Sequence, residues 1–210
     1  NAYSTYEAPR MSLARWEVGG RLHVGRSRND MLATHDRLRA RDIGLNVLDA
    51  LNAAREVALS RAAAYADVVM PGYTHLQSAQ PISYGHYLSA VAQAMARDAG
   101  RIEQAIVNMD ASPLGAGALA GTAFPIQREE TARLLGFSGC VENSLDAVAS
   151  RDFAWELMSA MTIASLTWGR IAQDFYVWAT PEVGLIEFPD SVAGTSSIMP
   201  QKKNPVVVEY

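Results

Sequence analysis

Several residue types are scarce in this sequence of 210 residues, and each scarcity excludes something. A single cysteine, Cys140, excludes an internal disulfide and is typical of a reducing compartment, so we expect the cytoplasm. No uninterrupted apolar run approaches the roughly 20 residues of a membrane span, and no secretory signal is recognisable. The net charge of -4 excludes a strongly basic surface, so we expect neither nucleic acid nor a membrane as a partner.

Lysine is also rare, and both lysines lie in one short segment, residues 194–205. The segment has the sequence Gly-Thr-Ser-Ser-Ile-Met-Pro-Gln-Lys-Lys-Asn-Pro. Pro200 and Pro205 exclude a helix between them, which predicts a mobile loop. The loop holds hydroxyl, ammonium and carboxamide groups and no carboxylate, and such donors suit a substrate rich in carboxylate oxygens. The alternative is a solvated turn.

A second group of polar donors follows the sharp turn that Gly25 permits. The side chains that can bind carboxylates here are Ser27, Arg28 and Asn29. The alternative is a helix N-terminus capped by Asn29 or Asp30. Both interpretations can hold, because a helix N-terminus is itself an anion site.

A third polar group lies between two predicted helices, where Pro71-Gly72 ends the first and Pro81 opens the second. Thr74 and His75 place a hydroxyl and an imidazole side by side. A lone histidine is more often a packed or surface group than a catalytic one. Sequence spacing alone therefore leaves both interpretations open for His75.

Three long stretches have helical periodicity: residues 31–69, residues 81–110 and a stretch from about 145 to 180. Their apolar residues recur at spacings of three and four: Leu48, Leu51, Ala54, Ala58, Ala62 and Tyr65 in the first, Leu88, Val91, Met95, Ala99, Ile102, Ile106 and Met109 in the second, and Leu157, Met161, Ala164, Trp168, Ile171, Phe175 and Trp178 in the third. The third seam resembles a coiled coil, and Asn143 is expected to cap that helix. Long helices without an alternating strand pattern predict an all-α bundle.

Shorter features complete the prediction. Residues 127–135 should form a short helix that ends at Gly136, and residues 112–121 a flexible loop of small side chains. Three arginines near the start of the first helix alternate with Asp36 and Asp42, which predicts a solvated face and not a nucleic-acid patch. These arginines are Arg37, Arg39 and Arg41.

The order of residues in the 194–205 loop resembles the signature loop of the fumarase/aspartase superfamily, and its Gln-Lys-Lys resembles the argininosuccinate lyase branch. Thr195 departs from the family pattern, because it stands between Gly194 and the serine pair. The stretches His-Val-Gly-Arg-Ser-Arg-Asn-Asp and Tyr-Thr-His-Leu-Gln are similar to two further motifs of the family. The resemblance implies a homotetramer with each active site built from three subunits. It also implies that residues 1–210 are the central helical domain of a longer chain.

The reaction that the resemblance implies is elimination from an N-substituted aspartate, which releases fumarate and an amine through an aci-carboxylate. The expected catalytic residues are Ser196 as base, Lys202, His75 and its orienting partner Glu209. The expected substrate contacts are Ser27, Arg28, Asn29, Thr74, Gln77, Ser197, Asn204 and Arg151. For Arg151, an ion pair with Asp152 or Glu156 is the alternative. No metal or cofactor is expected.

The leaving amine is the open part of this prediction. Argininosuccinate is the first expectation, with arginine as the amine and arginine biosynthesis as the setting. Three residues beside the substrate motif depart from many argininosuccinate lyases, namely Val24, Met31 and His35. A lyase for another N-substituted aspartate, such as ethylenediamine disuccinate, is therefore an alternative. A non-enzymatic structural protein of the crystallin type is another.

Overall fold

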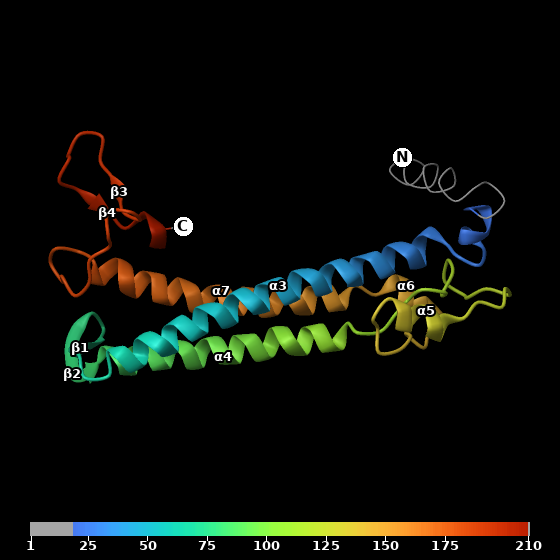
Figure 1. Cartoon of the computed structure of the whole chain (residues 1–210), viewed down its shortest axis with the longest axis horizontal. Coiled ribbons are helices and arrows are strands. Elements are labelled where there is room, and N and C mark those ends of the chain that lie inside the picture. The colour runs from blue at the N-terminus through green and yellow to red at the C-terminus, as the bar shows by residue number, and fades with distance from the viewer. Residues whose placement is uncertain (1–18, 210) are drawn as a thin grey trace. The chain divides into compact units, whose positions relative to one another are not determined.

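The computed structural model describes residues 19–209, and three long helices dominate it (Figure 1): α3 (Arg28–Ala64), α4 (Tyr84–Asn108) and α7 (Asp152–Trp178). The shorter elements are η1 (Gly20–His23), α5 (Arg128–Leu134), α6 (Ser144–Ala149) and η2 (Val206–Val208). Two hairpins pair β1 (Val69–Thr74) with β2 (Gln77–Ser83) and β3 (Gly194–Thr195) with β4 (Lys203–Asn204). The predicted all-α class is confirmed.

The described chain divides into two compact units. Unit 1 holds residues 19–45 and 104–157, and unit 2 holds residues 46–103 and 158–209. The helices α3, α4 and α7 contribute residues to both. The predicted seam of α4 is buried at Leu88, Val91, Met95, Ala99 and Ile102, and at Met109 just after the helix, while Ile106 is half-buried. In the seam of α7, Leu157, Ala164 and Trp178 are buried, but Trp168 is exposed.

The second long helix begins later than predicted. Pro81 lies in β2 and faces Pro71 of β1, and α4 begins at Tyr84. Neither proline has a backbone N–H for the ladder, and the register shifts between Pro71 and Tyr73. The two prolines are thus accommodated at an irregular point of a two-stranded hairpin. The sequence suggested a break between helices here, but the alternation was too short to reveal the strands.

The third predicted helix is divided in two. Asn143 does act as a cap, since its Oδ1 accepts from the backbone N–H groups of Leu145 and Asp146, but the capped helix is the short α6. Ser150 is extended, and α7 begins at Asp152. Arg151 lies in the break and donates to the carbonyl oxygens of Val148 and Ser150, which the interrupted helix leaves unpaired.

The predicted solvated face of α3 is wrong for two of its three arginines. Arg37 is 6% exposed, donates from Nη1 to the Met109 carbonyl at 3.2 Å, and lies over the Phe153 ring, 4.4 Å from its centroid. Burial lowers the pKa of Arg37, while Asp152 and Asp146 oppose that shift. Only Arg39 stays exposed, because α3 turns Arg37 and Arg41 toward the body of unit 1.

Arg41 is the second of these arginines. It donates to the carbonyl oxygens of Gly136 and Leu135, at 2.7 and 3.0 Å, and lies 3.7 Å from Asp110. These carbonyls belong to the end of α5 and the residues after it, where Gly136 has a φ of 72°. The predicted end of the short helix at Gly136 is therefore confirmed, and Arg41 stabilises it.

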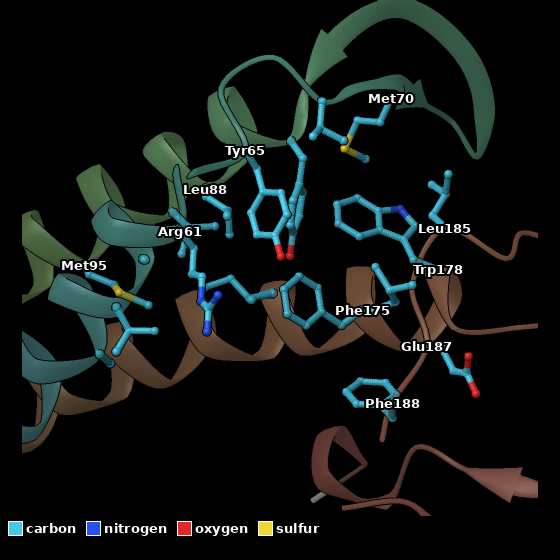
Figure 2. A pocket seen from close by; sticks show the side chains of 18 of the residues that line it. Arg61, Tyr65, Met70, Leu88, Met95, Phe175, Trp178, Leu185, Glu187 and Phe188 are labelled. Atoms are coloured by element: carbon cyan, nitrogen blue, oxygen red, sulfur yellow. The ribbon is translucent and has the colours of Figure 1, made fainter. Parts of the chain in front are cut away.

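In unit 2, parts of α3, α4 and α7 lie side by side around an apolar cavity of about 770 Å³ (Figure 2). Tyr65, Phe175 and Trp178 line it. The rings of Tyr87 and Trp178 meet edge to face. The Tyr87 hydroxyl donates a hydrogen bond to Asp174 Oδ2 at 2.8 Å. Burial raises the pKa of the Tyr87 phenol, and the hydrogen bond to Asp174 adds to the shift.

Candidate active site

The 194–205 segment forms a small hairpin instead of an irregular loop. Gly194 of β3 pairs with Asn204 of β4, and Thr195 pairs with Lys203. Gly194 is required here, since a Cβ on it would lie 2.5 Å from Cγ1 of Val206. Sequence reasoning predicted the non-helical backbone but not the strands, because each strand has only two residues.

Ser196 is the first residue of the hairpin tip. Its Oγ accepts hydrogen bonds from the backbone N–H groups of Ile198, at 3.4 Å, and Met199, at 3.2 Å. Hydrogen bonds that donate to an oxygen favour its negatively charged form. The tip thus provides two amide donors for an alkoxide on Ser196, while the neighbouring Ser197 is exposed.

The two lysines have different environments. Lys203 Nζ lies 2.8 Å from Glu187 Oε1 and 2.7 Å from Asp190 Oδ1, and its hydrogen bonds to Asp190 and then Glu187 raise its pKa. Lys202 makes no side-chain ion pair with any residue between 19 and 209. It lines, with Asn204, a cavity of about 820 Å³ between the hairpin and the chain that follows α7. Lys202 is therefore available to a ligand, whereas Lys203 holds the hairpin to residues 187–190.

His75 and Leu76 form the two-residue turn between β1 and β2, flanked by the pair Thr74 and Gln77. Both turn residues have positive φ, 55° and 59°. A turn with two positive φ values normally contains Asn-Gly or a similar pair, because a Cβ makes this conformation unfavourable. A leucine here is unusual, and backbone strain of this kind is concentrated at functional sites.

The N-terminus of α3 is a capping box. Ser27 Oγ accepts from the N–H of Asn29 at 3.3 Å, and Asp30 Oδ1 accepts from the N–H of Ser27 at 3.0 Å. The predicted cap, Asn29 or Asp30, is thus wrong by position: Ser27 is the cap, and Asp30 completes the box from within the helix. The Ser27 hydroxyl hydrogen stays available to a ligand, because the oxygen is the acceptor in the bond with Asn29.

Asp30 also links α3 to the glycine-rich loop of residues 112–121. Its Oδ2 accepts from the N–H groups of Gly115 and Gly117, at 3.1 and 2.9 Å, and the side chain is completely buried. Asn29 donates from Nδ2 to the Ala118 carbonyl at 3.0 Å. The loop predicted to be flexible is therefore held by a buried carboxylate. Sequence reasoning gave Asp30 no role at the site, although Ser-x-x-Asp at a helix start could have indicated one.

The structure brings only some of the predicted site residues together in one unit. Arg151 Nε pairs with Asp36 Oδ2 at 3.2 Å, and not with Asp152 or Glu156 as the alternative predicted. Glu209 lines a cavity beside α7, and no hydrogen bond or ion pair between described residues joins it to His75. Ser27, Arg28, Asn29 and Arg151 belong to unit 1, and the other predicted residues belong to unit 2. The pairing of Glu209 with His75 stays a prediction.

The largely apolar cavity of Figure 2 contains none of the predicted site residues. We assign the candidate site by its chemistry, since Lys202 and Asn204 line the cavity at the hairpin. Among residues 19–209, no three His, Cys, Asp or Glu side chains gather as a metal-binding group. Within the same range, no helix is long and apolar enough to cross a membrane.

Comparison with known proteins agrees with these features. A family described as lyase matches residues 8–210. Argininosuccinate lyase of Thermus thermophilus is 51% identical over 193 residues, which cover 91% of this chain and 42% of the relative. Argininosuccinate lyase 1 of Shouchella clausii is 47% identical over 194 residues, which cover 92% and 39%. The chain thus spans about two fifths of the length of these relatives.

Solved structures give the same grouping. EDDS lyase in complex with formate has a TM-score of 0.93 at 40% identity, over 97% of this chain and 41% of that one. The class II fumarase of Schistosoma mansoni has a TM-score of 0.76 at 26% identity, over 89% and 44%. The chain therefore belongs to the lyase family of the fumarase/aspartase superfamily. Its relatives assign it to the argininosuccinate lyase-like branch.

Proposed function

We propose that this chain is the central helical domain of a carbon–nitrogen lyase that releases fumarate from an N-substituted aspartate. Argininosuccinate is the proposed substrate, because curated relatives with that activity in their names are about half identical to this chain. The observation that carries the mechanism is the environment of Ser196, whose Oγ accepts hydrogen bonds from two backbone N–H groups. Close by in the sequence is Lys202, which makes no side-chain ion pair within residues 19–209.

The chemical difficulty is removing a proton beside a carboxylate, since a dianionic aci-carboxylate forms. Only groups that bind this transition state more tightly than the substrate accelerate the step. Ser196, as an alkoxide held by the amides of Ile198 and Met199, is the proposed base. Lys202 and Asn204, which line the cavity beside the hairpin, are proposed to donate hydrogen bonds to the growing charge.

Binding of the substrate's carboxylates is assigned to donors that the fold leaves unused. In unit 1 these include the hydroxyl of Ser27 and the second side-chain amide hydrogen of Asn29. Arg28, next to them in the sequence, is a further proposed contact. In unit 2 they include Thr74 and Gln77, which flank the turn that carries His75, together with Ser197. His75, oriented by Glu209, is proposed to assist protonation of the leaving nitrogen. Arg151 is a secondary substrate contact.

We also infer a homotetramer in which several subunits build each site, working in the cytoplasm. The outer face of α7 supports the assembly, because Met158 and Leu166 are 62% and 66% exposed there. Exposed apolar side chains on one helix face are typical of a protein–protein contact. An assembly of this kind would bring Glu209 of one subunit to the His75 turn of another.

A second candidate substrate is ethylenediamine disuccinate. It is favoured by the likeness to EDDS lyase and by the departures Val24, Met31 and His35, which lie beside the predicted substrate motif. Each departure removes or exchanges a polar group near the amine end. The crystallin-type structural role has no comparable support, since it leaves the chemistry of the Ser196 hairpin without a purpose.

The test is fumarate release from the full-length protein, followed by ultraviolet absorbance, with argininosuccinate and ethylenediamine disuccinate in parallel assays. Turnover of the first alone supports the main proposal, and turnover of the second alone supports the alternative. Ser196→Ala should lower kcat by about 10²- to 10⁴-fold while the circular dichroism spectrum stays unchanged. Ser191→Ala, which changes an exposed serine just before the 194–205 segment, is the matched control. An unchanged kcat in Ser196→Ala would refute the assigned base.

A further inference from the structure

A small cavity in unit 1 is lined by three arginines, and none of the predicted site residues lines it. Arg21, Arg26 and Arg128 surround a volume of about 240 Å³, together with apolar side chains that include Ile126. No carboxylate lines this cavity. Three guanidinium groups at one small cavity raise the local positive potential, which favours the binding of an anion.

Arg128 is the fixed member of this group. Its Nε donates to the Leu114 carbonyl at 3.3 Å, and its Nη2 donates to the Val141 carbonyl at 2.9 Å. Nη1 makes no hydrogen bond within residues 19–209, so its two hydrogens stay available. A guanidinium that is already held in place loses little conformational freedom when it binds a ligand.

Two glycines make room for this arrangement. Gly115 has a φ of 93°, and a Cβ on it would lie 2.6 Å from Cγ of Arg128 and 2.9 Å from Cδ1 of Ile126. Gly25 has a φ of 73°, and a Cβ on it would lie 2.9 Å from Cγ2 of Ile126. The backbone thus packs closely against Ile126 from two sides, and Arg128 lies across Gly115. The cavity is formed by fixed parts of the fold.

Arg21 and Arg26 are the exposed members, and neither makes a side-chain ion pair with another residue of the described chain. The carboxylates nearby are engaged or point elsewhere. Both carboxylate oxygens of Asp30 accept hydrogen bonds from backbone N–H groups. The Glu130 carboxylate forms an ion pair with Arg133 at 2.6 Å. Glu129 is exposed and does not line the cavity. Within residues 19–209, the positive charge of the cavity is therefore not neutralised by a carboxylate.

We propose that this cavity binds a small dianion, of the size of inorganic phosphate or a four-carbon dicarboxylate. Guanidinium groups bind both kinds of oxygen through paired hydrogen bonds, and the apolar wall at Ile126 limits the size of the ligand. The site is distinct from the Ser196 hairpin, which belongs to unit 2. It does not depend on the reaction proposed above.

The test is titration of the full-length protein with inorganic phosphate by isothermal calorimetry at low ionic strength. The double variant Arg21→Gln/Arg26→Gln should weaken phosphate binding at least about tenfold, since charge-assisted hydrogen bonds are lost. Arg39→Gln removes an exposed arginine of α3 outside the cavity and should change nothing. Lys202→Met should also leave phosphate binding unchanged, which separates this site from the proposed catalytic one.

Competition with succinate identifies the ligand class. Displacement of phosphate assigns the site to dicarboxylates as well, and no displacement restricts it to phosphate-like ions. The proposal is overturned if the double variant binds phosphate as tightly as the wild type, or if the wild type shows no saturable binding. It is equally overturned if Arg39→Gln weakens binding as much as the double variant, because the effect would then be general charge attraction.

Discussion

At the scale of single residues, the buried carboxylate of Asp30 decides how two parts of the candidate site are held. One of its oxygens fixes the cap residue Ser27, and the other fixes the glycine loop through Gly115 and Gly117. A carboxylate with three backbone donors is well satisfied even without exposure. Asp30 therefore holds the donors of Ser27 and Asn29 in position relative to that loop.

Asp30→Asn should destabilise the protein and disturb this region. An amide has one acceptor oxygen where the carboxylate has two, so at least one backbone N–H loses its partner. We expect a loss of about 1–3 kcal/mol in the free energy of unfolding, measured by chemical denaturation. Asp42→Asn is the matched control, because Asp42 is an exposed aspartate of the same helix. Equal stability of the two variants would contradict the role given to Asp30.

The neighbouring lysines should differ in their effects on activity. Lys202→Met removes a charge aimed at the proposed transition state and should lower kcat by about 10²- to 10³-fold. Lys203→Met removes only the attachment to Glu187 and Asp190, so the expected loss comes from misplacement of the hairpin and stays below about 100-fold. Steady-state kinetics of both variants measures the difference. The reverse order of effects would refute this division of roles.

Sequence analysis identified individual donors better than their partners. Ser27, Ser196 and Lys202 could be selected because hydroxyl and ammonium groups are recognisable from residue type and order alone. The partners of Arg151 and Lys203 could not, because Asp36 and Glu187 are far away in sequence and only the fold brings them near. The burial of Arg37 was missed for the same reason, since its packing partner Phe153 lies on another helix.

At the scale of elements, the β1–β2 hairpin carries strain that is open to a direct test. Leu76 has a φ of 59°, and its side chain is 77% exposed, so packing does not compensate for the strain. A left-handed conformation costs an L-residue about 1–2 kcal/mol. The unfavourable conformation of Leu76 therefore lies in the same turn as His75.

Leu76→Gly should therefore raise the free energy of unfolding by about 1 kcal/mol, since glycine adopts positive φ without a steric penalty. Thermal or chemical denaturation measures the change. Ser78→Gly, at an exposed and extended position of β2, should not stabilise the protein, and it serves as the control. A Leu76→Gly variant that is less stable than the wild type would show that Leu76 has contacts that outweigh the strain.

Element boundaries explain where the helical prediction succeeded and failed. The interior of α4 followed from periodicity, since its apolar residues recur at spacings of three and four from Leu88 to Ile106. The break between α6 and α7 gave no such signal, because no proline or glycine marks Ser150 and Arg151. Side-chain bonds from Arg151 to two carbonyl groups stabilise that break, and they are a property of the folded state.

At the scale of the whole molecule, the outer face of α7 should determine the oligomeric state. Met158 and Leu166 are apolar and exposed in the single chain. Leu166→Glu should reduce the assembly to smaller species, because a buried carboxylate without a partner is strongly unfavourable. Sedimentation velocity of the full-length protein measures this. Ala90→Glu, at an exposed position of α4, is the control, and an intact tetramer in Leu166→Glu would remove this face from the proposed interface.

The concentration of both lysines in one hairpin also makes the site chemically addressable. Within residues 1–210 every side-chain amine belongs to Lys202 or Lys203, so an amine-directed dye or crosslinker modifies side chains of this domain only at the candidate site. The raised pKa of Lys203 keeps it protonated between its two carboxylates and slows its acylation. Labelling should therefore favour Lys202. Protection of that amine by a ligand would report occupancy by mass spectrometry, without any need to observe turnover.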